Sequence, residues 1–221
     1  MVPNNIGAFT QRLKSKTFLE LVQAFLSRFT AKFIYLDCLL LLELSKLPVF
    51  SDRLIRGRGQ VREAVAGDID EMSLCDGKPS HLFKERFERG DFAVVGLIDG
   101  KVVGYEWFSA RDYYYDEHYH FGFKLEPGHV FAYDGYISVE YRVTGFYPKF
   151  KQFLAQKMVE MNLTTVVCLV DVNNRVAKNT CLRSGFKHIA TYWVVKLGRH
   201  RFALKSQVNQ EKETTPNKQG A

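Results

Sequence analysis

The chain has 221 residues, of which 46% are hydrophobic and 14% aromatic, and its formal net charge is +7 at pH 7. This length suits one globular domain with an appendage, and the aromatic content argues against a disordered chain. The positive charge favours anionic partners, but a nucleic-acid partner would also require a recognised binding motif, which we do not find in the sequence. We therefore expect no nucleic-acid partner.

Residues 1–50 are expected to form an N-terminal extension. Apolar side chains recur there every three or four residues, which indicates one face of a basic amphipathic helix: Phe18, Val22, Phe25, Phe29 and Phe33. Such a face commonly packs on the main domain, and peripheral contact of residues 9–33 with anionic lipid is the alternative. Residues 34–44 indicate a strand or another buried segment.

Residues 51–205 are expected to form the globular domain, and the polar residues 206–221 a disordered tail. The dipeptide Asp99-Gly100 predicts a tight hairpin turn, and residues 111–128 form a polar and aromatic insertion. The strands are expected at 60–65, 92–98, 102–110, 129–139, 164–170, 187–197 and 201–204, and the helices at 69–74, 80–89, 148–161 and 174–184.

The four cysteines and the N-terminus indicate the compartment. The cysteines show neither metal-site spacing nor close pairs, which is typical of a reducing compartment: Cys38, Cys75, Cys168 and Cys181. Charged residues interrupt any signal-peptide core, and the longest apolar stretch is too short to cross a bilayer. We expect a cytoplasmic protein.

Two neighbouring segments carry the chemistry. In the first, a strand leads into a helix through a turn with Arg142 and Gly145. Backbone N–H groups at the start of a helix attract anions, glycine allows a phosphate to approach the backbone, and arginine adds a permanent charge. The second segment begins at Asn174, continues with Ala177, and ends its helix at Gly185.

The order of these features resembles the GNAT superfamily of N-acetyltransferases. In that family the sequence Gln/Arg-x-x-Gly-x-Gly/Ala binds the pyrophosphate of coenzyme A, and Arg142, Gly145 and Tyr147 occupy the corresponding positions. The resemblance implies an α/β fold with a mixed central sheet, flanked by helices, in addition to the N-terminal extension. It also implies that two parallel strands, at 133–139 and 165–170, splay apart around the pantetheine arm.

The resemblance implies acetyl-CoA, or another acyl-CoA, as cosubstrate. Backbone groups at 137–139 would pair with pantetheine, one N–H would support the thioester oxygen, and Asn174 would contact coenzyme A. The expected binding residues are Ile137, Ser138, Val139, Arg142, Val143, Thr144, Gly145, Phe146, Tyr147 and Asn174.

Two positions depart from the family pattern. Tyr147 stands where glycine or alanine is usual, and Cys181 stands where many members carry a tyrosine that protonates the leaving thiolate. A thiol can donate a proton in principle, but a free cysteine is more often simply packed. Tyr147 or Tyr141 is the alternative acid, and the thiolate can also leave without help.

The attacking amine must be a free base, so a general base is expected. Asp134 is the first candidate, and Glu106 and Asp116 follow; an alternative is that Asp134 only faces solvent or caps a turn. His118, His120 and His129 lack zinc-site spacing, so no metal is expected.

These features predict an acyl-CoA-dependent N-acyltransferase, in the first instance an N-acetyltransferase. The acceptor would be a small-molecule or protein amine, and aromatic residues of the 111–128 insertion would form one wall of its pocket. The alternative is a GNAT-like module that binds coenzyme A or another protein and has lost catalysis, as the cysteine at position 181 suggests. The sequence does not determine the oligomeric state.

Overall fold

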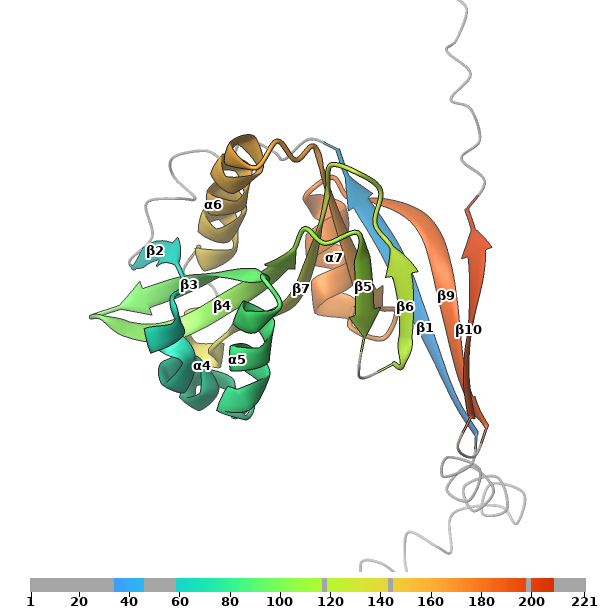
Figure 1. Ribbon diagram of the computed structural model, residues 1–221, viewed down its shortest axis with the longest axis horizontal. Helices are drawn as coiled ribbons and strands as arrows, with labels where there is room; N and C mark the ends of the chain where they lie inside the picture. The colour runs from blue at the N-terminus through green and yellow to red at the C-terminus, as the bar shows by residue number, and fades with distance from the viewer. Residues whose placement is uncertain (1–33, 46–58, 117–118, 143–144, 198–199, 209–221) are drawn as a thin grey trace, which may run out of the picture.

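The computed structural model describes residues 34–45, 59–116, 119–142, 145–197 and 200–208 (Figure 1). The amphipathic helix expected within residues 9–33 lies outside these ranges, as do residues 209–221 of the expected tail. No helix in the described ranges is long and apolar enough to cross a membrane.

Eight strands form one mixed sheet in the order β10-β9-β1-β8-β7-β4-β3-β2. Their bounds are β1 Ile34–Leu44, β2 Gln60–Glu63, β3 Phe92–Ile98, β4 Lys101–Ser109, β7 His129–Ile137, β8 Thr165–Asp171, β9 Lys187–Leu197 and β10 His200–Gln207. The β3–β4 turn is the predicted one, with positive φ angles of 51° at Asp99 and 78° at Gly100, as a two-residue hairpin turn requires.

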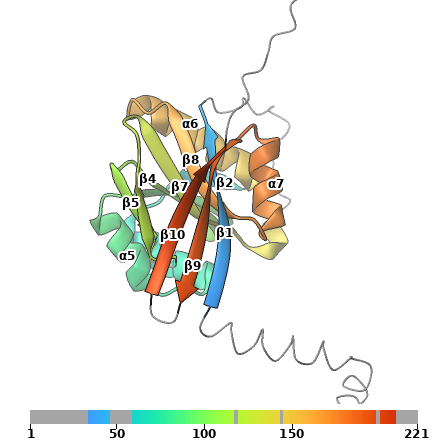
Figure 2. The same cartoon turned by 90° about the vertical axis from the view of Figure 1, so that its right-hand side faces the viewer.

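Strand β1 lies inside this sheet, although the sequence analysis placed it in an extension before the globular domain. It pairs antiparallel with β8 on one side and with β9 on the other, and Figure 2 shows it beside β9, with β10 on the far side of β9. Leu39, Leu41, Leu42 and Leu44 are buried. A boundary at residue 50 therefore does not separate β1 from the main sheet, because the strand is paired along both edges.

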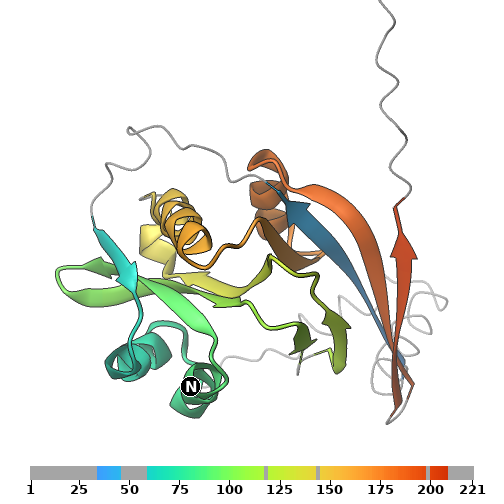
Figure 3. The ribbon, with the colours of Figure 1, turned by 45° about the horizontal axis from the view of Figure 1, so that its top comes forward.

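Helices cover both faces of the sheet (Figure 3). Helix α6, Phe146–Glu160, and helix α7, Arg175–Arg183, pack on one face through a core that includes Phe150 and Leu154. Helix α4, Ile69–Asp76, and helix α5, Ser80–Glu88, cover β3 and β4 on the other face through Met72 and Phe83.

The 111–128 insertion contains a small hairpin of β5, Tyr113–Asp116, and β6, Phe121–Lys124. Its buried aromatic side chains, Tyr114, Phe121 and Phe123, pack against the sheet at β1, β7, β8 and β9. The hairpin thereby covers the part of this sheet face that α4 and α5 leave open.

The only parallel pair among the described strands is β7 with β8, and it is short. His129, Val130 and Phe131 pair with Thr165, Val166 and Val167, and no pairing continues beyond them. The two strands therefore diverge toward their carboxyl ends. The predicted fold class, a mixed sheet with splayed parallel strands between helices, is confirmed.

Candidate active site

A cleft of about 720 Å³ opens where β7 and β8 diverge. Strand β4 and the helices α6 and α7 complete its walls, so the cleft lies beside the amino-terminal turns of two helices. Both expected signature segments border it, through Arg142 and Tyr147 in the first and Asn174 and Cys181 in the second. The fold thus joins two segments that are separate in the sequence.

The turn between β7 and α6 forms one end of the cleft. A short 3-10 helix, η2, Val139–Tyr141, follows β7, and Gly145 precedes α6 with φ 83°, a left-handed conformation that glycine adopts without strain. The first N–H groups of α6 have no partner within the helix. Val143 and Thr144 lie outside the described residues.

Several predicted binding residues have partners of their own. The Ser138 N–H donates to the Val103 carbonyl oxygen (2.9 Å), so it is not free to bind pantetheine as we expected. Arg142 is exposed, and its Nε donates to the Ile137 carbonyl oxygen (3.0 Å).

Asn174 caps α7 by accepting from the Ala177 N–H (3.1 Å). Val139 is exposed and Phe146 is buried, so Phe146 can offer a ligand only its backbone.

Strand β7 contains a β-bulge that was not predicted from the sequence. Tyr105 pairs with Tyr136 and Trp107 with Tyr133, so Glu106 alone faces Asp134 and Gly135. Asp134 has φ 46°, in the left-handed region. A bulge leaves backbone groups outside the ladder, here at the wall of the cleft. The Asp-Gly dipeptide inside a strand was the signal, because glycine there often marks a bulge.

Asp134, the first candidate for the general base, is engaged by two cations. One carboxylate oxygen accepts a hydrogen bond from Lys78 Nζ, and the other accepts from Arg86 Nη1. The Arg86 guanidinium in turn packs 5.3 Å from the Trp107 ring and 5.1 Å from the Tyr133 ring. With both oxygens occupied, this carboxylate mainly holds α5 and the preceding loop against β7. Asp116, the third candidate, accepts a hydrogen bond from the Tyr119 N–H (2.9 Å).

A buried ion pair occupies the wall of the cleft near the bulge. Lys151 Nζ, on α6, donates to Glu106 Oε1, on β4, at 2.6 Å, and both side chains are buried. Burial lowers the pKa of Lys151, but the Glu106 charge and hydrogen bond outweigh it and raise the pKa overall. Glu106 Oε2 is buried and has no hydrogen-bond partner among the described residues. Lys151 was not singled out from the sequence, because a lysine in an amphipathic helix usually faces solvent.

Tyr147 lies beside this ion pair, with its ring centroid 5.0 Å from Lys151 Nζ. Its hydroxyl oxygen is buried and, among the described residues, makes no hydrogen bond of standard geometry. Burial raises the pKa of Tyr147, although the positive charge of Lys151 opposes the shift. The side chain lines the cleft.

Cys181, on α7, lies at the same wall, with its Sγ 4.0 Å from Cys168 Sγ on β8. It is partly exposed, and its pKa is lowered, first by the hydrogen bond with Cys168 and further by Lys151, against the effect of burial. The cysteine thus packs against the core and lies beside a second thiol. The sequence could not have shown the pairing, because the two cysteines belong to different elements.

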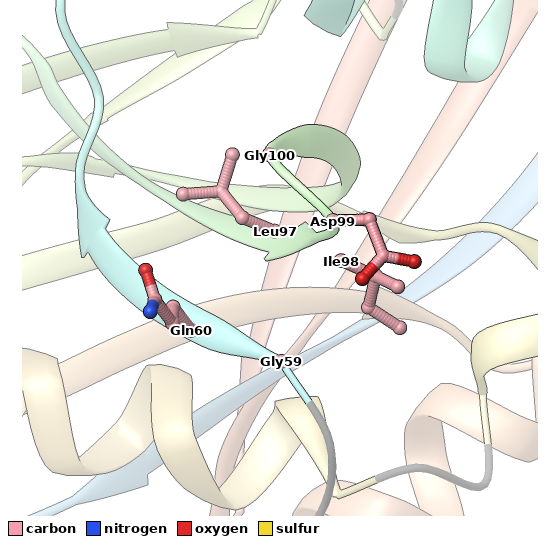
Figure 4. Close-up of a pocket in the computed structure, with 6 residues that line it drawn as sticks. All are labelled: Gly59, Gln60, Leu97, Ile98, Asp99 and Gly100. Atoms are coloured by element: carbon pink, nitrogen blue, oxygen red, sulfur yellow. The ribbon is translucent and has the colours of Figure 1, made fainter.

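Two further findings concern other sites. A separate hollow of about 450 Å³ lies at the β3–β4 turn, lined by residues 59–60 and 97–100 (Figure 4). It offers only one carboxylate, from Asp99, and so provides little catalytic chemistry. Within the described ranges, no group of three or more His, Cys, Asp or Glu side chains could hold a metal ion.

No protein-family model matches the sequence, and no curated protein matches it with significance. Solved structures share its fold. A protein from Novosphingobium aromaticivorans assigned to the GNAT family of acetyltransferases has 16% identity and a TM-score of 0.55 over 75% of this chain and 66% of its own. A GNAT-family acetyltransferase from Colwellia psychrerythraea has 16% identity and a TM-score of 0.50 over 74% of this chain and 56% of its own.

A conserved protein of unknown function from Staphylococcus epidermidis is also similar, with 14% identity and a TM-score of 0.51 over 78% of this chain and 66% of its own. The chain therefore spans less than two thirds of the length of each of these proteins. At such identities the likeness concerns the fold, and the protein has the fold of the GNAT superfamily.

Proposed function

We propose that the protein is an acyl-CoA-dependent N-acyltransferase that transfers an acetyl group to an amine. The divergence of β7 from β8 carries the proposal, because it opens a cleft beside a helix amino terminus and a buried, incompletely bonded carboxylate. The GNAT fold supports it as an analogy, since function is set by the site and not by the fold.

Acetyl-CoA, or another acyl-CoA, is the proposed cosubstrate. The described residues fit such a molecule, because Gly145 presents no side chain at the start of α6 and Arg142 offers a cation at the rim of the cleft. Together with Val143, Thr144 and the backbone of Phe146 and Tyr147, they would hold the pyrophosphate. The pantetheine arm would lie between β7 and β8, near Ile137, and Asn174 would contact it with its amide nitrogen.

The bulge provides the proposed support for the thioester oxygen. Since Ser138 N–H already donates to Val103, the donor must come from elsewhere. The N–H groups of Asp134 and Gly135 lie at the irregular part of β7, where the ladder does not use every backbone group. A donor fixed by the strand needs no reorganisation as negative charge develops on the oxygen.

Glu106 is the better candidate for the general base. Its Oε2 is buried without a partner, whereas both oxygens of Asp134 bind cations. Lys151 donates to Oε1 and thereby fixes the orientation of the carboxylate. Oε2 would then accept the proton of the attacking amine, directly or through one water molecule. Tyr147, whose hydroxyl is buried in the same cleft, is the proposed acid for the leaving thiolate, with Cys181 beside it.

The test measures acetyl-CoA consumption with a panel of amines: amino sugars, amino acids, polyamines and peptide amines. We expect turnover that requires one class of amine and falls steeply in Glu106→Gln. Binding of acetyl-CoA, measured by calorimetry, is determined in parallel. Tight binding without turnover for any amine would favour a non-catalytic binding module, and absence of binding would refute the proposal.

A further inference from the structure

Two cysteine thiols face each other at the wall of the cleft. Cys168 Sγ, on β8, and Cys181 Sγ, on α7, are 4.0 Å apart, and both residues line the cleft. The other two cysteines differ in their surroundings: Cys75 Sγ contacts Ser138 Oγ at 3.3 Å, and Cys38 lies on β1. All four are reduced.

The environments of the two thiols are unequal. Cys181 is partly exposed in the cleft, and its pKa is lowered by the hydrogen bond with Cys168 and by the nearby Lys151 charge. Cys168 is buried, and its pKa is raised by the same hydrogen bond and by burial. A thiolate is the reactive form of cysteine, so Cys181 is the thiol that a small oxidant would meet first.

We propose that Cys168 and Cys181 form a redox pair that a hydroperoxide converts into a disulfide at the wall of the cleft. An accessible, reactive thiol next to a second thiol is the arrangement that redox-sensing cysteines use. The proposal needs no unidentified partner, because both sulfur atoms belong to this chain.

The reaction balances with hydrogen peroxide as the oxidant. The Cys181 thiolate attacks one peroxide oxygen, the O–O bond breaks, and the products are a sulfenic acid and, after protonation, one water molecule. Cys168 then attacks the Cys181 sulfur, the S–O bond breaks, and the departing hydroxide takes the Cys168 proton as a second water molecule. Two thiols are oxidised to one disulfide, and one peroxide is reduced to two waters.

The fold allows the required approach. The two sulfur atoms must move from 4.0 Å to a bonded separation of about 2 Å. Cys168 is fixed in an interior strand between β1 and β7. Helix α7 has only nine residues, none of them fully buried, so it is the element that can shift. A disulfide would hold α7 against β8, and α7 also carries the cleft residues Val176, Ala177 and Thr180.

The redox pair is tested on the reduced full-length protein without acyl-CoA. The protein is treated with hydrogen peroxide, its remaining thiols are alkylated, and the digest is mapped by mass spectrometry. We expect a Cys168–Cys181 cross-link that dithiothreitol reverses, with two of the four thiols still alkylated. Cys75→Ser, the matched control, should give the same cross-link. The proposal is overturned if both thiols stay reduced while Cys75 is oxidised, or if cross-links to Cys75 form in equal yield.

The order of the two steps is tested with single variants. In Cys168→Ser the sulfenic acid should persist at Cys181, where dimedone traps it. In Cys181→Ser the buried Cys168 should react with peroxide about tenfold more slowly than Cys181 does in the Cys168→Ser variant. Equal rates would contradict the assignment of Cys181 as the first thiol. Serine is close to cysteine in size, and circular dichroism checks the fold of each variant.

The effect on the cleft rests on the proposed function and is measured separately. Cross-linked protein should bind acetyl-CoA at least about tenfold more weakly than reduced protein, and bound acetyl-CoA should slow cross-linking to a similar extent. If reduced protein does not bind acetyl-CoA, the proposed function fails. The cross-linking experiment then still tests whether Cys168 and Cys181 form a redox pair. If binding is equal in both forms, the disulfide does not control the cleft.

Discussion

Lys151 Nζ lies 2.6 Å from Glu106 Oε1, and this buried ion pair joins helix α6 to strand β4 at the wall of the cleft. The contact bridges residues far apart in the sequence and leaves one Glu106 oxygen without a partner among the described residues. Such a pair costs free energy to bury, so its position in the cleft supports a role beyond stability.

Replacing Glu106 with glutamine tests that role. The amide keeps the size of the side chain but removes the charge, so we expect kcat/KM for acyl transfer to fall by about 10²–10⁴-fold, the range for a general base. Lys151 loses its counter-charge, and the free energy of unfolding should fall by about 3–5 kcal/mol. Kinetics against pH and denaturant unfolding measure the two effects.

Lys151→Gln is the control that separates catalysis from stability. It should lower the free energy of unfolding by a similar amount while retaining the Glu106 carboxylate, so kcat/KM should fall less than in Glu106→Gln. A folded Glu106→Gln protein with wild-type kcat/KM would show that the ion pair is only structural.

Asp134→Asn should mainly affect stability. The change removes the counter-charge of Lys78 and Arg86, and these pairs are partly buried, with only 16% of the Asp134 side chain exposed. We expect the free energy of unfolding to fall by about 1–3 kcal/mol, between the values for exposed and buried pairs. If the Asp134→Asn protein is well folded and its kcat/KM falls more than that of Glu106→Gln, Asp134 is the general base instead.

Gly145→Ala should weaken acetyl-CoA binding. Gly145 has φ 83°, where an L side chain is strained by about 1–2 kcal/mol, and the added methyl group would also occupy the approach to the start of α6. Gly90→Ala is the matched control, since Gly90 also has φ 83° and a methyl group there would meet no atom within 4 Å. Both should lose similar stability in thermal unfolding, but only Gly145→Ala should lose the stabilisation by acetyl-CoA.

Strand β1 should be essential to the fold. Leu42→Ala removes a fully buried side chain between β8 and β9 and should cost about 2–5 kcal/mol of unfolding free energy. Leu36→Ala, on the same strand but 58% exposed, should change it by less than about 0.5 kcal/mol. Urea unfolding of both variants measures the difference, and equal losses would contradict the position of β1.

Asp68 should contribute an acid-sensitive part of the stability. Its carboxylate accepts two 2.6 Å hydrogen bonds from Arg62, which lower its pKa below the ordinary 3.8 despite the opposing effect of burial. The contribution is therefore complete above about pH 4 and is lost as the pH falls through the lower, folded-state pKa. Asp68→Asn should be less stable near neutral pH by about 1 kcal/mol, and the difference should shrink below pH 4. A pH-independent difference would exclude this linkage.

The local features of the fold follow from the sequence because they depend on adjacent residues. Asp99-Gly100 predicts its turn through the backbone angles that the turn requires, and Gly185 ends α7 with φ 91°. The order of the two signature segments also predicts the diverging strands and the helices around the cleft, through its resemblance to a known family. The general place of the proposed site therefore follows from the sequence.

Tertiary structure alone decides which side chains meet. Strand β1 lies between β8 and β9 because its apolar residues match both edges, and no local pattern specifies a partner so far along the chain. The same limit hid the Glu106–Lys151 pair, the two cations on Asp134 and the Cys168–Cys181 contact. Sequence patterns report the period and the ends of each element, whereas burial and charge pairing depend on the elements packed against it.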